Sequence, residues 1–145
     1  MATFVKLNGF VEHLAEKVHN LGSDQLVIAL TNTAPASEST PPTGATGTNI
    51  LANLTQISYT NCSTRNLTTS SSSQSSGTYS LVLTDLTLTA SGGTVGPFRY
   101  VYLYNDTPTS PADPLISYWD YGSSITLNAG ETFLIDFGAN VLTIA

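Results

Sequence analysis

Apolar residues near the start of the chain recur at alternating steps of three and four, the spacing of one face of an α-helix. This pattern predicts an amphipathic helix over about residues 4–21, ending near Gly22, because glycine commonly closes helices in the left-handed conformation. A helix this short is not stable alone in water, so its apolar stripe must lie on the chain's own sheet or on a neighbouring protein. The stripe consists of Phe4, Leu7, Val11, Leu14, Val18 and Leu21.

From Gln25 onward the apolar period changes to two, the period of β-strands. Residues 25–31 are apolar at almost every position, which indicates a strand buried on both faces. Residues 78–89 alternate, but the parity switches at Thr84-Asp85, which predicts a bulge or bend there. The other predicted strands are 98–104, 115–121, a hairpin of 125–127 and 132–137 around Asn128-Ala129-Gly130, and 141–144.

Seven or eight short strands preceded by one helix are typical of a mainly β fold, an antiparallel β-sandwich or a jelly roll. A chain of 145 residues suits a single domain, with the sandwich over about 25–145. Two long polar segments interrupt the strands, residues 32–48 and 63–76, and each is long enough to reach a partner as an arm. Within 63–76 we expect a polar strand followed by a turn at Ser75-Ser76-Gly77.

Charge is scarce: 10% of the residues are charged, compared with about 25% in an average domain. Serine and threonine, about a quarter of the chain, take its place. The chain is 41% hydrophobic, which argues against disorder, yet it has no apolar run near the roughly 18 residues of a membrane helix. The net charge of −6 and the scattered cations argue against nucleic acid and anionic lipid as partners. The cations are Lys6, Lys17, Arg65 and Arg99.

Few residues suggest catalysis. His13 and His19 are six residues apart in the predicted helix and would lie on different faces, unlike an i, i+4 zinc pair. For His19 we expect an exposed ion pair with Glu16, three residues earlier. Turn hydrogen bonds or an ion pair with Arg99 are favoured over paired-carboxylate catalysis for the acidic residues of the second half. These are Asp106, Asp113, Asp120, Glu131 and Asp136. We therefore expect no enzyme activity, no catalytic residues, no cofactor and no metal.

An aromatic stripe is the best candidate binding surface. Tyr100, Tyr102 and Tyr104 share one parity with Phe98, and together with Trp119 they could stack on sugar rings. We favour a role in the core or in a subunit interface over a glycan platform, because the strand is central in the sequence. The candidate interface residues are Phe4, Leu7, Val11, Leu14, Val18, Tyr100, Tyr102, Tyr104 and Trp119.

Several segments resemble a small structural protein common in the genomes of tailed bacteriophages. They are residues 6–24 running into 26–35, then 92–100, 103–107, and 114–127 with 130–133. The resemblance covers most of the chain. It implies a virion component, most plausibly a capsid decoration (cement) protein, with a tail or head–tail adaptor component as the nearest alternative. The family offers no catalytic residues to transfer to this chain.

A decoration protein would bind the major capsid protein and itself, and a trimer would suit the three-fold positions of a capsid. Low charge agrees with this role because it reduces the cost of desolvating the contact surfaces. The single cysteine, Cys62, and an N-terminus without an apolar signal region indicate synthesis in a reducing cytoplasm. The resemblance to phage proteins implies that this is the cytoplasm of a bacterial host. We expect the protein on the outer surface of the virion. A carbohydrate-binding or adhesin module built on the aromatic stripe is a further alternative.

Overall fold

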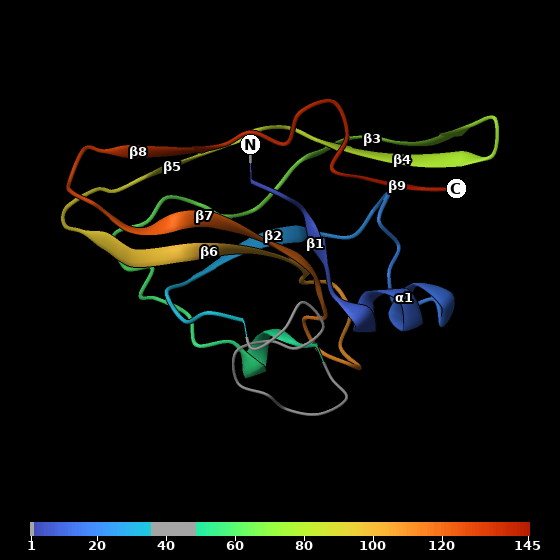
Figure 1. Cartoon of the computed structure of the whole chain (residues 1–145), viewed down its shortest axis with the longest axis horizontal. Coiled ribbons are helices and arrows are strands. Elements are labelled where there is room, and N and C mark those ends of the chain that lie inside the picture. Colours follow the sequence, from blue (N-terminus) through green and yellow to red (C-terminus); the bar gives the residue numbers. More distant parts are fainter. Residues whose placement is uncertain (1, 36–48) are drawn as a thin grey trace.

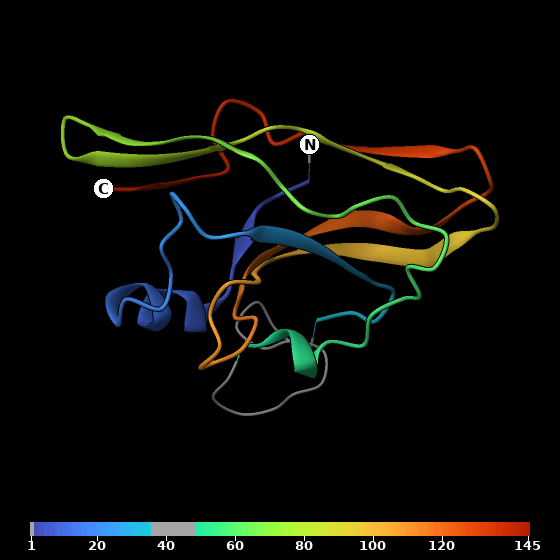
Figure 2. The same cartoon turned by 180° about the vertical axis from the view of Figure 1, so that it is seen from behind.

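The computed structural model describes residues 2–35 and 49–145. The described chain is mainly β, with antiparallel sheets and one short α-helix near its N-terminus, as predicted. Figure 1 shows the strands in two layers, and the reverse view in Figure 2 shows the same stacking. The expected jelly-roll topology stays a prediction.

The lower layer in Figure 1 is a four-stranded sheet of order β1-β7-β6-β2. Its two long central strands, β6 (Val95–Asn105) and β7 (Leu115–Leu127), are adjacent along the chain. They are flanked by β1 (Val5–Lys6) and β2 (Leu26–Thr31). All six residues of β2 are buried, which confirms the prediction of a strand covered on both faces.

The upper layer holds two smaller sheets. One has the order β3-β4-β9 and comprises Thr69–Ser75, Thr78–Leu83 and Leu142–Ile144. The other pairs β5 (Leu86–Thr89) with β8 (Thr132–Ile135). The predicted break at Thr84-Asp85 is confirmed, because the chain leaves one sheet after β4 and enters the other at β5. The polar strand is confirmed too: β3 is a strand from Thr69 onward, so 63–76 is not a loop throughout. Residues 36–48 of the other predicted loop lie outside the described residues.

Two apolar clusters cover the two faces of the four-stranded sheet. The larger lies between the layers and joins residues such as Ile28 and Leu103 below to Leu81 and Leu88 above. The smaller lies on the opposite face, where Leu54, next to the 3-10 helix η1 (Leu51–Asn53), packs with tyrosines of β6. Burial on both faces explains why β2 and β6 are apolar at almost every position.

The N-terminal helix is much shorter than predicted. Helix α1 spans Asn8–Ala15, not 4–21, because Val5 and Lys6 pair with Tyr118 and Ser117 as strand β1. At the other end Lys17 adopts a positive φ of 67°, which turns the chain out of the helix well before Gly22.

The predicted hairpin of 125–127 and 132–137 is wrong. The end of β7 pairs with β6, whereas β8 pairs with β5 in the other layer. The turn around Gly130 therefore carries the chain from one layer to the other (Figure 1). Turn residues between two alternating runs indicate a reversal, but they do not say whether the runs pair or cross between sheets.

Candidate functional site

The tyrosine stripe of β6 is part of the core. Tyr100, Tyr102 and Tyr104 are 6%, 0% and 4% exposed and belong to the smaller apolar cluster. The Tyr102 ring lies 5.3 Å from the ring of Tyr118 on the neighbouring strand. These rings are closed to sugars and to a partner surface, so of the two roles favoured over a glycan platform, core or subunit interface, the structure shows the core. Their inclusion in the interface set is wrong.

The alternation of the sequence predicts Phe98 on the same face as these tyrosines, but it lies on the opposite face of the sheet. It belongs to the cluster between the layers, because the β6–β7 register shifts between Phe98 and Tyr100. A shift of this kind reverses the face on which the following side chains lie.

The interface candidates predicted on the helix differ in how deeply they are buried. Leu7 is fully buried beside β7, and Leu14 and Val18 are half-buried. Val11 is 50% exposed and makes no part of either cluster. The buried face of the helix is instead formed by Phe10 and His13, because the chain before Asn8 is a strand and fixes a different rotation of the helix.

Trp119 and Phe4, the remaining two candidates, lie together at an open place between the layers. Their rings meet edge to face at 5.5 Å, and Trp119 also contacts Phe137 at 6.0 Å. Both rings line a groove of about 330 Å³ between β7 and β8. Its lining is Ala2, Phe4, Val101, Trp119, Tyr121, Phe133, Leu134, Ile135, Asp136, Phe137, Asn140 and Val141.

Of the large apolar side chains in the described residues, the two with the greatest exposed fractions line the groove. Leu134 is 59% exposed and Tyr121 51%, and the Tyr121 ring packs against Phe133 at 5.4 Å. Asp136 is the one charged residue in the lining. Its Oδ1 accepts a hydrogen bond from the Gly138 N–H at 2.7 Å. The arrangement suits apolar contact with a partner rather than acid–base chemistry.

The sequence did not single out Tyr121, Phe133 and Leu134. The available signal was the apolar run from Phe133 to Ile135, three consecutive positions in a strand that needed only alternate ones for the core. Trp119 and Phe4 were predicted as interface residues, but Trp119 as part of the aromatic stripe and Phe4 as part of the helical stripe.

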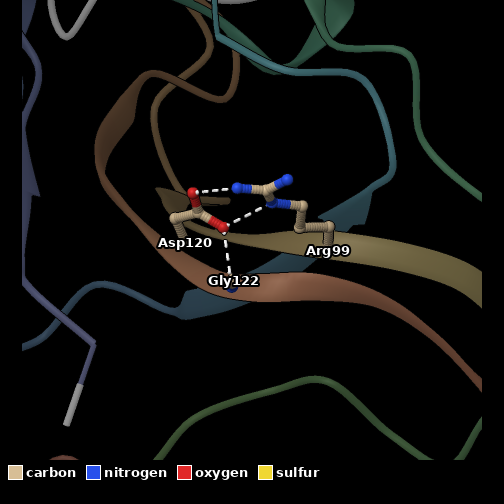
Figure 3. Close-up of polar contacts among 3 residues, drawn as sticks. All are labelled: Arg99, Asp120 and Gly122. Carbon is tan, nitrogen blue, oxygen red and sulfur yellow. Dashed lines mark hydrogen bonds and ion pairs between the residues drawn. The ribbon is translucent and has the colours of Figure 1, made fainter.

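Arg99 and Asp120 form the ion pair that the sequence suggested. Arg99 Nε lies 2.7 Å from Asp120 Oδ1, and Arg99 Nη2 lies 2.8 Å from Oδ2 (Figure 3). The Gly122 N–H also donates to Oδ1, at 2.8 Å. The hydrogen bonds from Arg99 lower the pKa of Asp120, and the Asp120 carboxylate raises the pKa of Arg99. An ionised, paired carboxylate of this kind is a poor general acid.

The other carboxylates have local partners. Asp85 accepts a hydrogen bond from the Phe137 N–H at 3.0 Å, and Glu131 accepts one from the Asn128 N–H at 2.7 Å. Burial, followed by the nearby charge of Asp106, raises the pKa of Asp113. Within residues 2–35 and 49–145, no three His, Cys, Asp or Glu side chains gather closely enough to hold a metal ion.

The two histidines are buried together, contrary to the expected exposed pair of His19 with Glu16. His13 and His19 are 7% and 6% exposed, with ring centroids 5.9 Å apart. The helix ends at Ala15, so helical spacing does not separate them. His19 Nδ1 lies 3.1 Å from Asn105 Nδ2, which also donates to Asp24 Oδ2 at 2.6 Å. Burial and the neighbouring His13 lower the pKa of His19 to about 4.

Cys62 is half-buried and forms no disulfide within the described chain. Burial raises the pKa of its thiol, which keeps it protonated and poorly nucleophilic near neutral pH. None of the helices in the described ranges has the length and apolar character needed to cross a bilayer. Comparison of the chain with protein-family models, with curated proteins and with solved structures found no match.

Proposed function

We propose that this protein is a non-enzymatic structural component of a phage virion, a decoration protein that binds the outer surface of the major capsid lattice and stabilises the head. The observation that carries the proposal is the exposed aromatic groove between β7 and β8, with Leu134 and Tyr121 at its mouth. Exposed apolar patches of this kind, on an otherwise polar surface, mark places where proteins meet.

The remainder of the surface supports the same reading. The hairpin of β3 and β4 extends past the end of the four-stranded sheet, and β3 presents serines rather than charges (Figure 1). Neutral hydroxyl groups can be desolvated against another protein at a lower cost than charges. The choice of a phage virion as the assembly comes from the resemblance of most of the chain to small phage structural proteins. On this proposal the protein is made in the bacterial cytoplasm and acts on the capsid as a homo-oligomer, with a trimer matching the three-fold positions.

Copy number in purified particles tests the proposal. A ratio to the major capsid protein near one, measured by quantitative mass spectrometry, is the expected result. A few copies per particle would indicate a tail or adaptor component, and absence from particles would refute a virion role. Particles produced without the protein should also lose infectivity at a lower temperature than decorated ones.

Variants connect the groove to this function. Tyr121→Ser combined with Leu134→Ser removes exposed apolar surface and should abolish recovery of the protein with particles. Val11→Ser is the matched control, because Val11 is also 50% exposed but lies on α1, outside the groove lining. Equal recovery of both variants would exclude the groove as the contact with the capsid.

A further inference from the structure

We propose that the free edge of β8, with the groove beside it, binds an extended segment of another protein by strand addition, and that this segment carries apolar residues and a lysine or arginine. The identity of the partner as a capsid subunit rests on the proposed function, but the mode of binding does not.

The first observation is that the groove runs along β8 and the residues that follow it. Five consecutive residues, 133–137, line it. In an extended chain, successive side chains point to opposite faces, so one face can supply only alternate residues. Three of the five, 133–135, are consecutive residues of β8, so the groove follows the edge of the strand rather than one of its faces.

The second observation concerns the direction of the β8 backbone groups. The Ala90 N–H donates to the Glu131 carbonyl at 3.0 Å, and Leu88 is the partner of Phe133 in the register. Residue pairs of an antiparallel ladder alternate between hydrogen-bonded and non-hydrogen-bonded. Counting by twos from Glu131, the backbone N–H and C=O groups of Phe133 and Ile135 face β5. Those of Thr132 and Leu134 face the opposite edge, where β8 has no strand partner among the described residues. An incoming strand can take up these donors and acceptors.

The third observation is the charge at the site. Asp136 is the only charged residue of the lining, and the chain as a whole has a net charge of −6. Asp136 Oδ1 is bonded to Gly138, and no hydrogen bond joins Oδ2 to a described residue. A cationic side chain in the partner complements this carboxylate, whereas an acidic segment of a second copy placed in this groove does not.

The size of the groove fits side chains of an extended segment. A volume of about 330 Å³ lies at the small end of ligand pockets, which span roughly 300–1,000 Å³. It admits a few apolar side chains and not a whole helix. Trp119, Phe133 and Phe4 supply the apolar walls.

The test uses the whole protein and two capped nine-residue peptides of alternating threonine and valine. One carries lysine in place of two threonines, and its twin carries glutamate at the same places. Titration followed by amide NMR should show micromolar to millimolar binding of the lysine peptide, with the largest shifts at Thr132 and Leu134. The glutamate peptide should bind at least tenfold more weakly.

Three variants examine the contacts separately. Leu134→Pro removes an outward N–H and leaves the ladder to β5 intact, as edge strands tolerate. It should weaken binding at least tenfold compared with Leu134→Ala, which keeps the N–H. Thr132→Pro, at the first residue of β8, makes the same test if Leu134→Pro does not fold. Asp136→Asn should remove the preference for lysine over glutamate while its side-chain oxygen still accepts from Gly138.

Each outcome bears on the proposal. No binding of the lysine peptide at millimolar concentration, or equal binding by the alanine and proline variants, overturns it. A dimer that forms without peptide and is lost in Leu134→Pro overturns it in favour of a second copy. Peptide binding by a protein that is absent from particles refutes the proposed function alone. Normal decoration of particles by Leu134→Pro refutes strand addition and leaves the function standing.

Discussion

Acidification should destabilise this protein through one buried imidazole, His19. Because Asn105 Nδ2 is a donor, the facing His19 Nδ1 is the acceptor and the proton of the neutral ring sits on Nε2. A proton on Nδ1 would place donor against donor. Asn105 cannot turn its amide to help, because its Oδ1 accepts from the Thr107 N–H at 3.1 Å and its Nδ2 donates to Asp24.

The magnitude follows from the pKa of His19. Burial, and then the neighbouring His13, lower this pKa from 6.5 to about 4, although the Asp24 carboxylate acts in the opposite direction. Between these pH values the unfolded chain binds a proton at this site that the folded chain does not bind. The free energy of unfolding therefore decreases as the pH is lowered. At about 1.4 kcal/mol per pH unit, the loss between pH 7 and pH 4 is ~3 kcal/mol.

The assay is urea unfolding of the wild type and of His19→Gln at several pH values from 7 to 4. Glutamine does not titrate, and its amide oxygen can still accept from Asn105. Carboxylates titrate in both proteins, so the difference between the two curves isolates the imidazole. The wild type should lose ~3 kcal/mol more than the variant, beginning near pH 6.5 and ending near pH 4.

Two results would refute this reasoning. Parallel stability curves for the wild type and His19→Gln would show that His19 does not carry the acid sensitivity. An NMR titration in which the His19 ring of the folded protein protonates near pH 6.5 would show that its burial is not maintained in solution. A third control is Glu16→Gln, which removes the carboxylate once expected to pair with His19 and should leave the pH dependence unchanged.

Three further predictions concern packing, a buried hydroxyl and the surface ion pair. Leu7→Ala should lower the free energy of unfolding in urea by about 2–5 kcal/mol because Leu7 is fully buried, whereas Val11→Ala should change it by less than ~0.5 kcal/mol. Tyr102→Phe should raise stability by ~1 kcal/mol, because no described residue bonds to the buried Tyr102 hydroxyl; the same change at Tyr59, whose hydroxyl accepts from the Leu30 N–H at 2.8 Å, should lower stability. Asp120→Asn should leave the midpoint of thermal unfolding nearly unchanged, because its pair with Arg99 is about 40% exposed, and a large decrease would contradict that account.

The sequence alone predicted the strands whose apolar pattern is set by local alternation. The apolar run of β2 identified a strand buried on both faces, and the parity switch at Thr84-Asp85 located the change of sheet. The N-terminal helix was overestimated because Phe4 and Leu7 fit a helical stripe by chance. Leu7 is buried and Phe4 is half-buried because the segment between them pairs as a strand, a long-range contact that no local pattern encodes.

The candidate site was predictable only in part, for a related reason. Trp119 and Phe4 were singled out, but their meeting with Phe133 depends on the crossing of the chain between layers after Gly130. The same alternating runs are compatible with a hairpin, in which this groove would not exist. The burial of His19 likewise depends on the positive φ of Lys17, which a lysine seldom adopts.

The way in which the outer strand edges are protected bears on whether the groove binds a partner. Free strand edges invite unwanted pairing, and proteins usually cover or distort them. The outer edge of β2 is covered by the segment 57–67, where Ile57 and Leu67 donate to β2 carbonyls and the Ile28 N–H donates to the Arg65 carbonyl. The edge of β7 is distorted where the register shifts near Gly122, whose φ is 97°. Among residues 2–35 and 49–145, nothing of either kind protects the edge of β8, which instead adjoins the exposed Leu134. An uncovered edge beside an apolar groove is a liability unless a partner occupies it, so we expect Leu134→Lys to improve the solubility of the isolated protein while abolishing its binding to a partner.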